Sequence, residues 1–463
     1  MAEPCDLDAV SLLDAYRRGA LSPVEVMASV LDRMERAEPL LAATWAATSE
    51  DAMAEAGASA ARWRAGRPCG VLDGVPVTLK ELIATRGLPK PMGTAAADMS
   101  PQPADAPPTA RLREAGAIIF ARTTVPDYGM LSSGLSSFHR LSRNPWDVTR
   151  TPGGSSAGAG SAAAAGYGPL HVGTDIGGSI RLPAGWCGIF GLKPSNGRIP
   201  IDPPYYGRVA GPMTRTVADA ALLMAVLSQP DGRDHMSLPP ADLPWHDLDI
   251  DLRGLRIGLM RDAGCGLAVD PAVMEAVTAA ASALADQGAI VTEVGPVITR
   301  DMLDGLDRFW RTRFLAEMEA LPPARQALIL PYIRAWVGAA RDYGPLDVYH
   351  GMDQMMRMKL AARDLFGGLD FILSPTSPVP AFPAEWASPV NDPARPFEHI
   401  AFTVAWNMSE HPAASINCGY TADGLPIGLQ IIGRRFDDVG VLRLSRFYEA
   451  VRPAARPWPT PWL

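Results

Sequence analysis

Residues 151–187 read TPGGSSAGAGSAAAAGYGPLHVGTDIGGSIRLPAGWC. Two clusters of glycine and serine flank a run of small residues at 157–165, which predicts a helix, and the PLHVG stretch after it predicts a strand. Glycine leaves the backbone beside each serine uncrowded. A serine hydroxyl becomes a nucleophile once a neighbouring base accepts its proton. The segment therefore predicts a helix–strand unit that carries a site for serine chemistry.

The rest of the chain alternates between helical and strand-like patterns, which predicts an α/β sheet. Val75, Val77 and Leu79 alternate with polar positions, so Lys80 is expected on the opposite face of a half-buried strand. Helices are predicted over 6–19, 23–37, 49–65, 108–115, 217–228, 271–287 and 437–450, with three more between 300 and 366. Further strands are predicted over 71–79, 117–123, 255–260, 289–293 and 370–373, and near 413–418 and 427–432.

The chain of 463 residues shows no internal repeat and no low-complexity linker, so a single domain over 1–463 is expected. Residues 231–249 are rich in proline and polar side chains, and we interpret them as a surface excursion within that domain. The tail at 452–463 carries repeated prolines, so it cannot be helical and is expected on the surface.

Charge and cysteine content narrow the partners and the compartment. Lysine plus arginine is 42 and aspartate plus glutamate is 50, so the net charge is −8, and no basic run is long enough to bind a phosphate backbone. Nucleic acid is therefore not expected as a partner. Five scattered cysteines fit reduced thiols in the cytoplasm. No signal peptide opens the sequence and no apolar run approaches the ~20 residues of a membrane span, so no membrane association is expected.

The second cluster, GTDIGGSIR at 173–181, predicts a nucleophile and an oxyanion site. Two glycines before Ser179 allow successive backbone N–H groups to turn toward one point, and such a nest stabilises negative charge. Ser179 is the candidate nucleophile. The candidate oxyanion donors are the N–H groups of Ile176, Gly177 and Gly178, together with that of Ser179 itself.

The first cluster leaves two interpretations open. Ser155 and Ser156 precede the helix predicted at 157–165, so they are either ordinary helix caps or hydroxyls held at a helix N-terminus for chemistry. The role of Lys80 is equally open, because a lysine at the end of a strand is usually exposed to solvent. Burial would lower its pKa enough for it to act as a base.

Competing motifs lack their structural context. Residues 154–158 match G-x-S-x-G and residues 158–163 resemble a dinucleotide fingerprint, but neither follows a predicted strand. His171 lies in the PLHVG strand and is expected to be a core histidine, and the histidine spacing suggests no metal. Cys187 is expected to be a packed small residue, with nucleophilic attack as a minor alternative.

The motifs closely resemble the amidase signature family, whose signature runs from G-G-S-S through G-T-D-x-G-G-S-x-R to G-x-x-G-x-K-P, here Gly153–Pro194. The resemblance implies one α/β domain with its signature core at about 70–230, a mixed sheet of roughly ten strands covered on both faces by helices, and no cofactor or metal. Glu81 and Ala157 depart from the residues common in the family. Further similar segments are GVPVTLKE (74–81), NPWD (144–147), GPMTRTVADAALL (211–223), DFILSPTSPVPA (370–381) and GLPIGLQIIGRRFDD (424–438).

Carried over to this chain, the resemblance implies a triad for amide hydrolysis. Ser179 is the nucleophile, Ser155 is a bridging serine held by a cis peptide bond, and Lys80 is the terminal base. Ser156, Asp175 and Arg181 match positions that support this relay through hydrogen bonds, although stapling of the loop is an equally good interpretation for them.

The variable segments favour a free-standing hydrolase. After GLKPS the chain reads NGRIPIDPPYYGRVAGPMTRT and lacks the A-S-S-L-D-Q segment usual in the catalytic subunit of glutamyl-tRNA amidotransferase. That subunit stays an alternative. A carbamate or ester hydrolase on the same triad is a second alternative. The expected substrate is a small hydrophobic or aryl amide, anilide or carbamate. A homodimer is a possible oligomeric state. The expected pocket comprises loop 128–137, with Met130 and Leu131, and the variable helices at 300–366, which supply Trp310, Tyr332, Trp336, Tyr349, Met352, Met355, Met356 and Met358.

Overall fold

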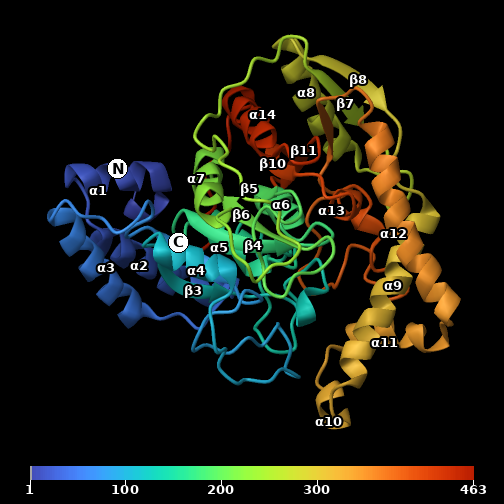
Figure 1. Cartoon of the computed structure of the whole chain (residues 1–463), viewed down its shortest axis with the longest axis horizontal. Coiled ribbons are helices and arrows are strands. Elements are labelled where there is room, and N and C mark those ends of the chain that lie inside the picture. The colour runs from blue at the N-terminus through green and yellow to red at the C-terminus, as the bar shows by residue number, and fades with distance from the viewer. Residues whose placement is uncertain (1–2, 463) are drawn as a thin grey trace.

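The computed structural model describes residues 3–462, and these form an eleven-stranded sheet in the order β1-β3-β2-β4-β6-β5-β10-β11-β9-β7-β8 (Figure 1). The strands are β1 (Thr44–Trp45), β2 (Pro76–Lys80), β3 (Ile118–Thr123), β4 (Leu170–Asp175), β5 (Phe190–Lys193), β6 (Val209–Thr214), β7 (Arg256–Met260), β8 (Ile290–Val294), β9 (Phe371–Pro375), β10 (Ala413–Tyr420) and β11 (Pro426–Gly433). The α-helices are α1 (Ala9–Arg18), α2 (Pro23–Leu41), α3 (Ser49–Arg64), α4 (Pro107–Glu114), α5 (Ala157–Ala165), α6 (Arg181–Cys187), α7 (Val217–Leu227), α8 (Pro271–Asp286), α9 (Arg300–Glu319), α10 (Pro323–Gln326), α11 (Pro331–Gly338), α12 (Pro345–Leu365), α13 (Val404–Met408) and α14 (Asp438–Val451).

The sheet is mixed, as the resemblance implies. β2 runs parallel to β3 and β4, and β7 runs parallel to β8 and β9. The strands between these two groups, β6, β5, β10 and β11, pair antiparallel with their neighbours. Because β2 and β4 are parallel neighbours, their last residues, Lys80 and Asp175, lie at the same edge of the sheet.

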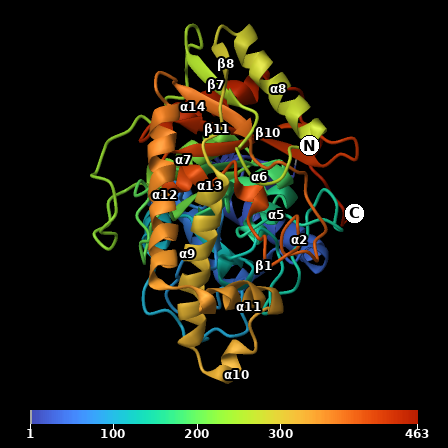
Figure 2. The same ribbon diagram turned by 90° about the vertical axis from the view of Figure 1, so that its right-hand side faces the viewer.

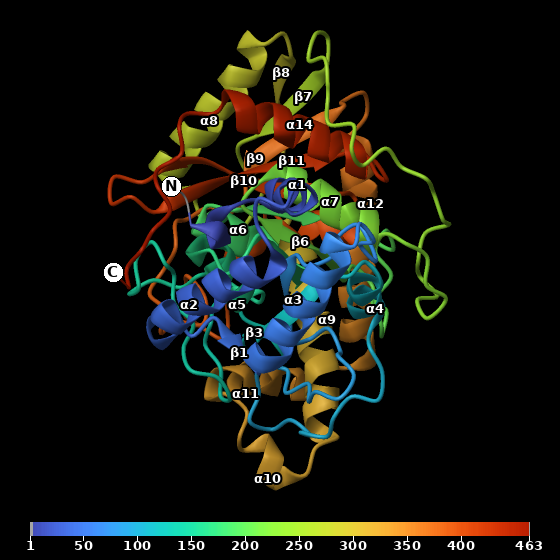
Figure 3. The ribbon, with the colours of Figure 1, turned by 90° about the vertical axis from the view of Figure 1, so that its left-hand side faces the viewer.

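Helices cover both faces of the sheet. On one face α1, α4, α7, α8 and α14 share an apolar core with Val77 and Leu79 of β2. On the other face α5 packs against β4 and α6 packs against β10 and β11. The long helices α9 and α12 pack along each other over this second face (Figure 2), and α2 and α3 pack together beside the β1–β3 edge (Figure 3).

β2 is buried on both faces, so the prediction of a half-buried strand is wrong. Its polar face, which includes Lys80, lies beneath α5, and the Lys80 side chain is 0% exposed. α5 contains only alanine, glycine and serine, and a Cβ atom at Gly158 would collide with the carbonyl of Ala43. These small side chains allow the helix backbone to approach its neighbours closely enough to seal that face.

Several elements were not predicted. β5 and β6 contain Gly191, Gly211 and Pro212, which lower strand propensity, and pairing with their neighbours in the sheet overrides it. α6 contains Pro183 and Gly185 and resembles a loop in sequence. β1 and α13 are only two and five residues long, and four α-helices instead of three lie between 300 and 366.

The segment interpreted as a surface excursion is anchored in the core. Residues 231–249 form neither helix nor strand, but Trp245 in this segment is buried in the same core as α7 and α14. Within residues 3–462, the helices are too short or too polar to cross a bilayer.

Candidate active site

Three segments meet around the amine of Lys80. The Nζ atom lies 2.8 Å from Oγ of Ser155, 2.9 Å from Oγ of Ser156 and 3.3 Å from the carbonyl oxygen of Thr174. Ser155 and Ser156 immediately precede α5, and the peptide bond between Gly154 and Ser155 is cis. Thr174 is the penultimate residue of β4. The end of β2, the start of α5 and the end of β4 therefore share one buried polar centre.

The hydroxyl of Ser156 is fully used within this centre. It donates to the carbonyl of Thr174 at 3.1 Å and accepts from the N–H of the same residue at 3.3 Å as well as from Lys80. It makes no capping hydrogen bond to α5, so the interpretation of Ser156 as an ordinary helix cap does not hold. Because a hydroxyl offers one proton and two lone pairs, Ser156 has no capacity left. Among the described residues, Lys80 is the only hydrogen-bond partner of Ser155 Oγ.

Burial sets the charge state of Lys80. Burial is the largest cause that lowers the pKa of Lys80; the carboxylates of Asp175 and Glu81 oppose it and the positive charge of Arg208 adds to it, and together they bring the pKa from 10.5 to about 7. A substantial fraction of this amine is therefore neutral at physiological pH.

The neutral amine has two N–H bonds and one lone pair, and its surroundings determine where each points. The carbonyl of Thr174 can only accept, and the proton of Ser156 is already given to that carbonyl. Neutral Lys80 therefore donates to Thr174 and Ser156 and directs its lone pair to the hydroxyl of Ser155.

Ser179 lies in the turn between β4 and α6 and is half-buried. Its carbonyl accepts a hydrogen bond from the N–H of Ser156 at 3.2 Å, which joins the two serine clusters. The N–H of Gly178 donates to Oδ1 of Asp175 at 2.8 Å, so the prediction of Gly178 as an oxyanion donor is wrong for this geometry. The N–H groups of Ile176, Gly177 and Ser179 donate no hydrogen bond to the described residues, and three of the four predicted donors remain.

A cavity of about 310 Å³ opens onto both serine clusters. Ser155, Ser179, Ile176 and Gly177 line it, whereas Gly178 does not. Met130 and Leu131 also line it, as does Trp310. Of the other side chains expected from 300–366, Trp336, Met355 and Met358 are buried in the core and Tyr349, Met352 and Met356 are exposed. The remaining lining residues include Tyr128, Phe314, Phe397 and Ile400 and the charged residues Lys90, Arg208, Arg313 and Glu317.

A buried ion pair supports the turn that carries Ser179. Oδ1 of Asp175 accepts from Nη2 of Arg181 at 2.9 Å, and both side chains are completely buried. Burial opposes ionisation of Asp175, but the charge of Arg181 and the amide of Asn407 outweigh it and hold the pKa of this carboxyl below its usual range.

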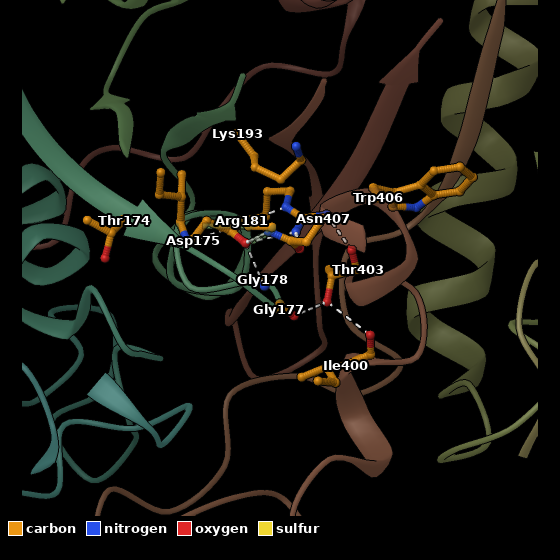
Figure 4. A network of polar contacts seen from close by, with 12 residues as sticks. Thr174, Asp175, Gly177, Gly178, Arg181, Lys193, Ile400, Thr403, Trp406 and Asn407 are labelled. Carbon is orange, nitrogen blue, oxygen red and sulfur yellow. Dashed lines mark hydrogen bonds and ion pairs between the residues drawn. The ribbon is translucent and has the colours of Figure 1, made fainter. Parts of the chain in front are cut away.

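Residues far along the chain complete this network, and the sequence analysis missed them (Figure 4). Arg181 donates to the carbonyl of Thr403 at 2.9 Å, to Oε1 of Gln430 at 2.7 Å and to Oδ1 of Asn407 at 2.6 Å. Thr403 immediately precedes α13, Asn407 lies within α13, and Gln430 lies on β11. No local motif marks these three side chains.

The alternative nucleophiles and ligands do not reach the cavity. His171 is a core histidine, hydrogen bonded to Thr78 at 2.8 Å and to the carbonyl of Gly168 at 3.1 Å. Cys187 is buried, which raises the pKa of its thiol. Within residues 3–462 one group, Glu3, Cys5 and Asp6, has the proximity of a metal site, but both carboxylates already pair with Arg33.

The fold and the lysine–serine centre define the class of protein, and the comparison with known families agrees. The family model named Amidase matches residues 25–442, and the chain belongs to the amidase signature family. A curated relative, the A-type subunit of the glutamyl-tRNA(Gln) amidotransferase of Chloroflexus aggregans, is 35% identical over 94% of both chains.

Solved structures of the same family share the whole fold. A bacterial aryl acylamidase of the amidase signature family superposes with a TM-score of 0.88 at 28% identity and covers 96% of each chain. The peptide amidase of Stenotrophomonas maltophilia gives a TM-score of 0.83 at 25% identity over 98% of each chain. The family and its fold are therefore established by similarity over nearly the full length, whereas the named activities of these proteins differ.

Proposed function

We propose that this protein is a serine amidase that hydrolyses a carboxylic amide through a covalent acyl-enzyme, with Ser179 as nucleophile, Ser155 as proton relay and Lys80 as base. The observation that carries the proposal is the contact of 2.8 Å between Lys80 Nζ and Ser155 Oγ inside a fully buried centre. The low pKa of Lys80, about 7, supports a neutral amine in that role.

In the first half-reaction Ser155 gives its proton to Lys80 and takes the proton of Ser179. The Ser179 oxygen forms a bond with the amide carbon, and the protonated lysine then returns its proton through Ser155 to the nitrogen as the C–N bond breaks. The amine leaves and the acyl group stays as an ester on Ser179. In the second half-reaction the same relay takes a proton from water, which attacks the ester and releases the carboxylic acid.

The free N–H groups of Ile176, Gly177 and Ser179 are the proposed oxyanion donors, since they have no competing acceptor among the described residues. Ser156, Asp175 and Arg181 are proposed as positioning residues. Ser156 fixes the direction of the amine, and the other two hold the turn.

The apolar part of the cavity supports a hydrophobic or aryl amide, anilide or carbamate as substrate. Trp310, Phe314 and Phe397 line it together with Met130 and Leu131. The aryl acylamidase with a TM-score of 0.88 favours the same class. An ester or carbamate hydrolase would use the same groups, because only the leaving atom differs.

The name of the curated relatives favours a second candidate, the A-type component of a glutamyl-tRNA amidotransferase, which would act with a tRNA substrate. Against it stands the segment after GLKPS, NGRIPIDPPYYGRVAGPMTRT, which lacks the A-S-S-L-D-Q segment usual in that component. We favour a free-standing enzyme acting on small molecules, without nucleic acid or membrane partners. The five cysteines, all free thiols, support a cytoplasmic setting.

A substrate panel tests the proposal. The purified chain is assayed on aryl amides, aliphatic amides, carbamates, esters and glutamine, beside a Ser179→Ala variant. We expect hydrolysis of aryl amides by the chain alone and none by the variant. Activity confined to glutamine would favour the amidotransferase. Fluorophosphonate probes should modify Ser179, and an adduct located on Ser156 by mass spectrometry would overturn the proposed nucleophile.

A further inference from the structure

Two cationic side chains line the cavity without a carboxylate partner. Lys90 and Arg208 are both half-buried and both belong to the lining, and neither forms an ion pair with the described residues. Arg313 lines the same cavity but is paired, since its Nε lies 3.0 Å from Oε1 of Glu317 and its guanidinium lies 3.7 Å from the ring centroid of Tyr205. Lys90 and Arg208 therefore bring positive charge to the cavity without a carboxylate in direct contact.

The carboxylates around the cavity offset this charge only in part, since none of them forms an ion pair with Lys90 or Arg208 among the described residues. Asp234 is occupied, because its carboxylate accepts the N–H groups of Ile201 and Met236 at 3.0 and 2.8 Å. Asp202 is exposed to solvent. The guanidinium of Arg208 donates to the carbonyl of Pro203, which carries no formal charge.

Such an arrangement is costly for the protein alone. Burial lowers the pKa of Lys90, and the positive charge of Arg208 lowers it further. Burial also lowers the pKa of Arg208, to about 10. Two like charges held in a partly desolvated cavity repel each other, and an anion placed between them removes this repulsion.

We propose that Lys90 and Arg208 form a subsite for an anionic group of the substrate, so that the preferred substrate is a hydrophobic amide that also carries a carboxylate. This inference rests on the proposed amidase function and narrows its substrate class. The apolar side chains of Trp310, Phe314 and Phe397 would receive the hydrophobic part, while the carboxylate accepts charge-assisted hydrogen bonds from the two cations.

Binding to a Ser179→Ala background tests the subsite without turnover. Two pairs of ligands place the carboxylate on either side of the amide: glutaryl against pentanoyl 4-nitroanilide, and N-acetyl-4-aminobenzoate against N-acetyl-4-toluidine. Dissociation constants are measured by calorimetry at pH 7, so that Arg208, with a pKa of about 10, stays charged and the protonation of Lys80 is common to both members of each pair. In at least one pair we expect the carboxylate ligand to bind about tenfold or more tightly, as charge-assisted hydrogen bonds allow.

Variants then assign the preference to the cations. Lys90→Met should lower the ratio of affinities about tenfold, Arg208→Met should do the same, and Lys90→Arg should retain it. Arg253→Met, at an exposed site outside the cavity, removes the same charge and should leave the ratio unchanged. Equal affinities within both pairs, absence of binding, or a ratio that Lys90→Met leaves intact would overturn the subsite. Failure of wild-type protein to hydrolyse any amide would instead overturn the proposed function, because these binding measurements need no turnover.

Discussion

The hydroxyl of Thr403 donates a hydrogen bond of 2.6 Å to the carbonyl oxygen of Gly177. The N–H on the other side of the same peptide unit, that of Gly178, donates to Asp175 at 2.8 Å. The peptide unit is thus held at both ends, by the last residue of β4 and by a residue more than two hundred positions away in sequence. This fixes the neighbouring N–H groups that we propose as oxyanion donors.

Loss of this contact should reduce turnover more than binding. Thr403→Val removes the hydroxyl at nearly constant volume, so the peptide unit loses one of its two anchors, and we expect kcat for an aryl amide to fall about 10- to 100-fold with little change in KM. Thr403→Ser keeps the hydroxyl and should stay near wild type. If the valine variant raised KM alone, the contact would serve substrate binding instead.

The two adjacent serines should differ sharply. Ser155 is the one hydroxyl whose proton can reach the lone pair of Lys80, so Ser155→Ala should lower kcat about 10³-fold or more. Ser156→Ala removes one of the three partners of the Lys80 amine and the acceptor of the Thr174 N–H, which should cost about 1–3 kcal/mol of stability and lower kcat much less than Ser155→Ala does. Steady-state kinetics and thermal unfolding of both variants measure the difference. Equal losses of kcat would contradict the proton assignment.

The rate should depend on the protonation of Lys80. Because its pKa is about 7 and the neutral form is the proposed base, kcat/KM should rise about tenfold per pH unit below 7 and level off above it. Lys193 is an internal control, since burial lowers the pKa of this lysine to about 7 as well and its Nζ donates to the carbonyl of Pro194. Lys193→Met should keep the profile. A flat profile in the wild type, or one abolished by Lys193→Met, would refute the assignment.

The same lysines should make stability depend on pH. Lys80 and Lys193 lose their protons near pH 7 when folded and near 10.5 when unfolded, so the unfolded state binds more protons between these values. The free energy of unfolding should therefore rise with pH in that window. Lys193→Met should lower the slope by up to about 1.4 kcal/mol per pH unit, measured by urea unfolding between pH 7 and 10. The exposed variant Arg253→Met should keep the wild-type slope.

The sequence predicted the parts of the site that are encoded locally. Ser155, Ser179 and the glycine nest lie within one short segment, and alternation placed Lys80 on the face of β2 that meets α5. The burial of that face was not predictable from β2, because it depends on how closely α5 packs. Gly178 was assigned as a donor because the sequence does not reveal that Asp175, three residues earlier, accepts its N–H.

Long-range contacts explain the remaining differences. Thr403, Asn407 and Gln430 are ordinary residues in sequence, and only the arrangement of α13 and β11 beside α6 brings them to Arg181. Helices α9 to α12 have apolar positions on several sides, so sequence alone could not tell that Trp310 lines the cavity while Trp336 packs in the core.

The order in which the chain is synthesised gives this network a further meaning. A nascent chain that ends before α13 already contains Lys80, Ser155 and Ser179, but Arg181 then has neither the carbonyl of Thr403 nor the side chains of Asn407 and Gln430 as partners. Of the side-chain partners described above, such a fragment contains only Asp175. The turn that carries Ser179 therefore gains its full set of anchors only after β11 has been synthesised, and a chain that ends before α13 is expected to hold this turn less rigidly.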